Sequence, residues 1–78
     1  MSEYQLQIDG RVGLSDYSNI YDYMGFVSVN DNFTIILEES DKENAEIIES
    51  LLANCNFSIA SKGGTEDGRY YITALRNK

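Results

Sequence analysis

The sequence predicts an α+β fold: a two-layer sandwich with two helices on one face of an antiparallel-rich sheet. Three observations predict it. Short segments of alternating polar and apolar residues are typical of half-buried strands. Two other segments place apolar residues at helical spacing, and they fall between the strands along the chain. The chain has 78 residues, of which 42% are hydrophobic. This size fits a single small globular domain over residues 1–78.

The first two predicted elements are a strand and a short helix. Apolar and polar residues alternate over residues 4–12, which indicates a strand. A helix is expected over residues 16–24, because Ser15 suits an N-cap and Gly25 suits a helix end. Its apolar side chains recur at positions i, i+3, i+4 and i+7, which are Tyr17, Ile20, Tyr21 and Met24. We expect Tyr17 and Tyr21 to lie in the core.

The next segment is predicted to form a β-hairpin. Residues 26–29 and 33–38 are rich in β-branched and aromatic residues, and residues 30–32, Asn-Asp-Asn, suit the turn between them. A three-residue connection places the apolar side chains of both strands on the same face.

The second helix has the strongest local signal. Residues 40–43 form a capping box, and two acidic residues stand in the first turn, where the helix dipole favours them. Apolar residues are expected on one face: Ala45, Ile47, Ile48, Leu51, Leu52 and Cys55. The opposite face carries Glu43, Glu46 and Glu49.

Two further strands complete the predicted fold. They are expected over residues 57–60 and 69–75, joined by a flexible polar loop over residues 62–68. The resulting order is βαββαββ, and a ferredoxin-like arrangement of the sheet is the topology it favours.

The composition argues against catalysis and metal binding. The chain has no His and one Cys, so it lacks the commonest general base and the ligands of a thiolate metal cage. We therefore expect no enzyme activity, no cofactor and no metal site. The N-terminus has no basic and apolar signal segment, and no apolar run is long enough to span a membrane. The expectation is a cytoplasmic protein.

Charge is the most informative functional feature. Residues 14–50 hold nine acidic residues against Lys42, a net charge of −8, whereas residues 51–78 carry a net charge of +2. Such a distribution repels nucleic acid and attracts basic partners. The sequence therefore predicts a small acidic protein-binding module that occupies the basic surface of a nucleic-acid-binding protein, as an inhibitor or DNA mimic. Its size and charge suit a phage or mobile-element protein that blocks a host defence enzyme.

The residues expected to bind this partner are acidic side chains in and next to the second helix, together with two tyrosines. They are Glu39, Glu43, Glu46, Glu49, Tyr23 and Tyr70. Tyrosine suits an anchor because it combines apolar area with a polar tip. The alternative is an acidic helix face that only keeps the chain soluble.

Two other functions stay open. The segment Asp9-Gly10-Arg11-Val12-Gly13-Leu14 resembles the turn between the first strand and the first helix of amino-acid-binding ACT domains. This resemblance covers about six residues, and it implies a small-ligand-binding regulatory domain with its site around Arg11, Gly13 and Leu14. The third function is a homo-oligomeric structural protein that pairs through exposed sheet edges. The expected oligomeric state is a monomer or a homodimer.

Overall fold

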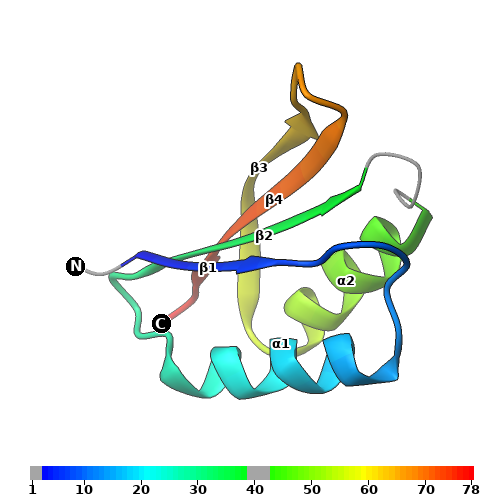
Figure 1. Cartoon of the computed structure of the whole chain (residues 1–78). Coiled ribbons are helices and arrows are strands. Elements are labelled where there is room, and N and C mark those ends of the chain that lie inside the picture. Colours follow the sequence, from blue (N-terminus) through cyan, green and yellow to red (C-terminus); the bar gives the residue numbers. More distant parts are fainter. Residues whose placement is uncertain (1–2, 39–42) are drawn as a thin grey trace.

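A computed structural model describes residues 3–38 and 43–78 of the chain. The elements along the chain are β1 (Glu3–Gln7), α1 (Leu14–Phe26), β2 (Asn32–Glu38), α2 (Glu43–Asn54), β3 (Phe57–Gly64) and β4 (Arg69–Arg76). Figure 1 shows both helices on the same face of a curved four-stranded sheet. The predicted α+β class, with two helices on one face, is therefore confirmed.

The sheet is mixed, and its strand order is β1-β2-β4-β3. β1 and β2 are parallel neighbours joined by α1. α2 joins β2 to β3, and β4 then inserts between these two strands, antiparallel to both. The predicted βαββαββ order and the ferredoxin-like arrangement are not confirmed, because the described residues follow the order βαβαββ and the parallel pair lies at one side of the sheet.

The prediction of a strand over residues 26–29 is wrong, because this segment forms a helix end and a turn. Phe26 is the last residue of α1, and the N–H of Val27 donates to the carbonyl of Tyr23 at 3.2 Å, as in a continuing helix. The chain then turns at once, because the N–H of Ser28 donates to the Asp31 carboxylate at 2.9 Å. Val27 is buried at this turn, so its apolar character reflects burial at a helix end rather than a strand.

α1 also begins earlier than predicted. Its N-cap is Gly13, not Ser15, and the Gly13 N–H donates to the Asp16 carboxylate at 2.9 Å. This bond satisfies a backbone donor that a helix N-terminus otherwise leaves unpaired. The helix then runs through Gly25 to a length of 13 residues.

The core lies between the helices and the sheet and is centred on Phe33. This ring stacks against Tyr23, with 5.7 Å between centroids, and meets the edge of Phe57 at 6.4 Å. Two residues expected in the core, Tyr21 and Ile47, are each 55% exposed. Because each helix covers the sheet with a single narrow stripe, apolar positions on its outer side stay in solvent.

The loop predicted over residues 62–68 is shorter in the structure, because residues 62–64 belong to β3. β3 continues to Gly64, and the Thr65 N–H donates to the Arg69 carbonyl at 2.7 Å to close a tight turn. Gly68 has φ of +83°, a conformation that glycine adopts without steric cost. Residues 65–68 thus form the turn that joins the two strands.

Candidate functional site

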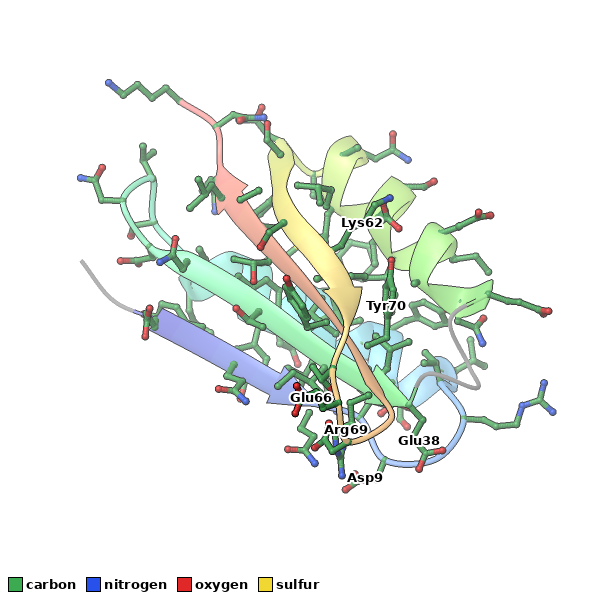
Figure 2. The ribbon with its side chains drawn as sticks, turned by 90° about the horizontal axis from the view of Figure 1, so that it is seen from above. Asp9, Glu38, Lys62, Glu66, Arg69 and Tyr70 are labelled. Atoms are coloured by element: carbon green, nitrogen blue, oxygen red, sulfur yellow. The ribbon has the colours of Figure 1, made fainter. Side chains whose placement is uncertain are left out.

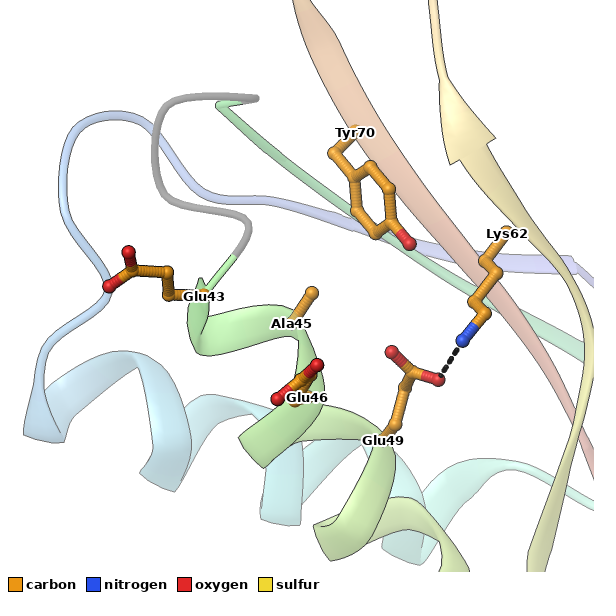
Figure 3. Close-up of a pocket in the computed structure, with 6 residues that line it drawn as sticks. All are labelled: Glu43, Ala45, Glu46, Glu49, Lys62 and Tyr70. Atoms are coloured by element: carbon orange, nitrogen blue, oxygen red, sulfur yellow. Dashed lines mark hydrogen bonds and ion pairs between the residues drawn. The ribbon is translucent and has the colours of Figure 1, made fainter.

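An open cleft of about 280 Å³ lies between α2 and the β3–β4 hairpin, and Figure 3 shows its lining. It is lined by Glu43, Ala45, Glu46, Glu49, Lys62 and Tyr70. We call it the acidic cleft. The structure therefore brings together four of the six residues that the sequence predicts for partner binding, from elements that are separate along the chain.

α2 carries its three glutamates beside the hairpin, and Glu49 is the one that contacts it. They recur every three residues, so they follow one flank of the helix over successive turns. The opposite flank contacts α1, where the Tyr17 hydroxyl lies 3.4 Å from Asn44 Oδ1. Between these flanks, Ala45, Ile48 and Leu52 are buried against the sheet. The burial of this stripe leaves Glu49 beside β3 and Glu43 and Glu46 toward solvent.

An ion pair spans the acidic cleft. Lys62 Nζ lies 2.7 Å from Glu49 Oε1, and the Glu49 side chain is only 18% exposed. The hydrogen bond and the charge of Glu49 raise the pKa of Lys62 above its ordinary value of 10.5, and Tyr70 and Glu46 act in the same direction. Glu43 and Glu46 are exposed and point away from Lys62 (Figure 3). The cleft lining thus holds three carboxylates and one ammonium group.

Tyr70 forms the sheet side of the cleft. It pairs with Gly64 across the hairpin and packs partly buried against the core, with its hydroxyl directed toward the cleft (Figure 3). Tyr71 lies on the other face of the sheet, where its ring covers Gly63. The opposite orientation of the two tyrosines agrees with the alternation of side chains along a strand.

The other two predicted partner-binding residues are not in the cleft. Tyr23 lies on α1, partly buried, and its ring face stacks on Phe33. Glu39 lies outside the described residues. Sequence reasoning missed Lys62, because its role depends on a hairpin register that no local pattern encodes.

The three residues suggested by the ACT-like segment surround the start of α1. Arg11 is exposed, Gly13 is the N-cap, and Leu14 is 88% exposed. None of them lines the acidic cleft or the second cleft at the hairpin turn.

The second cleft, of about 220 Å³, is lined by Arg69 and by the carboxylates of Glu38 and Asp67. Arg69 lies 3.5 Å from Asp9 Oδ1 and 3.8 Å from Asp67 Oδ2, and Glu38 is its neighbour in the register of β2 and β4. Figure 2 shows Arg69, Asp9 and Glu38 at the turn end of the hairpin. Arg69 links the segment that follows β1 to the hairpin. Because three carboxylates lie around one guanidinium, this cluster has a net negative charge.

Within the parts of the chain that the structure describes, no group of Cys, Asp and Glu side chains is arranged to hold a metal ion. Cys55, just after α2, is partly buried against the core and has a free thiol. Over the same residues, no helix has the length and apolar character needed to cross a membrane.

Comparisons with known proteins give no relative: no family model, no curated protein and no solved structure matches the chain.

Proposed function

We propose that the chain is a non-enzymatic protein-binding module that docks on a basic surface of its partner through the acidic cleft. The observation that carries this proposal is the convergence of Glu43, Glu46, Glu49 and Tyr70 on one cleft. The lining contains one cation, Lys62, and Glu49 already pairs with it. Two exposed carboxylates therefore remain for lysine or arginine side chains of a partner.

The net charge of the helical layer also supports docking on a basic surface. α1 and α2 carry five acidic residues and no lysine or arginine: Asp16, Asp22, Glu43, Glu46 and Glu49. Since both helices lie on one face of the sheet, their charges add to one negative field. A field of this kind accelerates encounter with a basic partner and weakens as salt concentration rises.

Tyr70 is the proposed anchor. It borders the carboxylates and is held in place by the core behind it. An aromatic side chain that is already ordered loses little conformational entropy on binding. Charged groups around such an anchor supply orientation and specificity.

A basic surface of this kind is typical of nucleic-acid-binding proteins, which neutralise phosphates with lysine and arginine. We therefore propose that the module acts in the cytoplasm as a competitive inhibitor or DNA mimic of such a protein. Phage or mobile-element origin fits a small acidic inhibitor.

Affinity capture with matched charge variants tests this function. The bait proteins are the wild-type chain, the triple variant Glu43→Gln, Glu46→Gln, Glu49→Gln, and a control triple variant Glu3→Gln, Asp22→Asn, Glu66→Gln. Both triple variants lose the same charge, and all three control residues are exposed. Captured proteins from a lysate of the source organism are identified by mass spectrometry at low and high salt.

The expected result is a basic protein that the wild type and the control variant capture at low salt and that the cleft variant releases. Equal capture by all three baits, or equal loss with both triple variants, would contradict docking at the acidic cleft.

A further inference from the structure

The outer edge of β3 is an unpaired strand edge beside the acidic cleft. β3 is the last strand in the sheet order, and among the described residues only β4 pairs with it. An edge strand presents N–H and C=O groups that bind another strand. This feature is independent of the charges on α2.

The hairpin register identifies which groups of β3 face outward. The Thr65 N–H bonds to the Arg69 carbonyl, so by the alternation of an antiparallel ladder Gly63 and Ser61 also face β4. Lys62 and Gly64 therefore direct their backbone N–H and C=O groups away from the sheet. Their side-chain positions lie on the α2 face, opposite Ile72 and Tyr70.

The charges around this edge favour a basic occupant. β3 itself has one charged residue, Lys62, and its charge is paired with Glu49. The α2 flank beside it carries Glu46, which is exposed, and Glu49. Lys62 shows that a lysine on the α2 face of a strand here reaches a glutamate of α2, since Nζ lies 2.7 Å from Glu49. A strand added to β3 lies about 4.8 Å farther out, within reach of the same flank for a lysine or arginine side chain.

We propose that the partner binds through an extended basic segment that adds to β3 as a fifth strand, with alternate lysine or arginine side chains directed at the glutamate flank of α2, on which Glu46 is exposed. The proposal rests on the function proposed above and defines the partner's binding mode. Backbone hydrogen bonds supply affinity, and the alternating cations supply specificity.

A second copy of the chain fits this edge poorly. Pairing of β3 with β3 of another copy brings two α2 glutamate flanks to the same interface. Like charges facing each other across an interface disfavour association. The charge pattern therefore favours a basic segment over self-association.

Two synthetic peptides of about eight residues, the length of β3, provide the probes. One alternates lysine with valine and threonine. The other has the same composition with its lysines gathered in one block. Affinity is measured at low salt by fluorescence anisotropy, and amide hydrogen exchange of the chain is followed with and without peptide.

The matched variants are Gly64→Pro and Gln5→Pro. Proline removes an outward N–H and is tolerated on edge strands. The Ile8 N–H bonds to the Ile36 carbonyl of β2, so by the same alternation Gln5 faces outward on β1, the other edge of the sheet. The control therefore makes the same change far from the cleft.

We expect the alternating peptide to bind more tightly than the block peptide and to protect the Lys62 and Gly64 amides from exchange. Gly64→Pro weakens binding about tenfold, whereas Gln5→Pro changes it by less than about twofold. Equal affinity for both peptides, or no effect of Gly64→Pro, would overturn strand addition.

Glutamine variants separate this proposal from the proposed function. If Glu46→Gln with Glu49→Gln weakens peptide binding but Gly64→Pro does not, strand addition is wrong and docking at the acidic cleft stands. If neither change weakens binding, both are wrong. Sedimentation of the chain alone as a dimer that Gly64→Pro dissociates would also overturn the proposal, because β3 would then pair with a second copy.

Discussion

At the scale of single residues, the hairpin turn is held by the Thr65 side chain. Its hydroxyl donates to the Asp67 carboxylate and accepts the Arg69 N–H at 3.1 Å. The Thr65 hydroxyl lowers the pKa of Asp67 below its ordinary value of 3.8, and the Arg69 charge acts in the same direction. These bonds organise a turn of about four residues next to Lys62 and Tyr70.

This pKa shift predicts an acid-range effect on stability. A carboxyl group with a lowered folded pKa stabilises the fold above its ordinary pKa, and the contribution is lost as pH falls through the folded value. The free-energy difference between wild type and Asp67→Asn should therefore be constant above about pH 5 and shrink below pH 3.8. Urea unfolding at a series of pH values measures it.

Thr65→Val provides the matched variant, because it removes the hydroxyl and leaves the carboxylate. We expect it to reduce the same acid-range dependence. Parallel stability curves for wild type and Asp67→Asn over the whole acid range would contradict the assignment.

The residues of the acidic cleft differ in how far they could be predicted from neighbouring sequence. The glutamates of α2 were predicted from a capping box and a helical period, which depend on neighbours in the sequence. The Lys62–Glu49 pair joins residues 13 apart on two elements. This pair depends on the hairpin register. The carboxylates of the cleft could therefore be predicted from the sequence, whereas the lysine that pairs with one of them could not.

At the scale of elements, Arg76 fastens the end of α1 to the sheet. Its Nη1 donates to the carbonyls of Met24 and Val27 at 2.9 and 3.0 Å, and its guanidinium lies 5.8 Å from the centre of the Phe57 ring. A cation at a helix C-terminus also interacts favourably with the helix dipole. This clamp explains how α1 ends without a basic residue in its own last turn.

Arg76→Met should destabilise the fold by about 2 kcal/mol, because it leaves two carbonyls without their charged donor. Chemical denaturation measures the change. Arg11→Met, at an exposed position, is the control and is expected to change stability by less than about 0.5 kcal/mol. Equal stability of the two variants would show that the clamp contributes nothing.

The segment after α1 illustrates how tertiary contacts override local preference. Residues 26–29 read as a strand because Phe and Val favour strands. In the fold, burial of Met24 and Val27 and the contact with Arg76 extend the helix, and Asp31 then turns the chain. The contact between Arg76 and Val27 joins residues 49 apart, so no local pattern could indicate it.

At the scale of the whole molecule, the two layers differ in charge. The helices carry five acidic residues and no basic residue, whereas Lys62, Arg69 and Arg76 all belong to β3 and β4. The class of fold was predictable from the alternation of helical and strand patterns. The sheet order was not, because the insertion of β4 between β2 and β3 depends on pairing between distant segments.

The most direct test of the account is an NMR titration of the isotopically labelled chain with the alternating lysine peptide at low salt. If the acidic cleft is the docking surface, the largest shifts appear in the α2 glutamates, in β3 and at Tyr70, and α1 and β1 change little. Shifts spread over both helices in proportion to their charge, or centred on α1 and β1, would contradict the central claim.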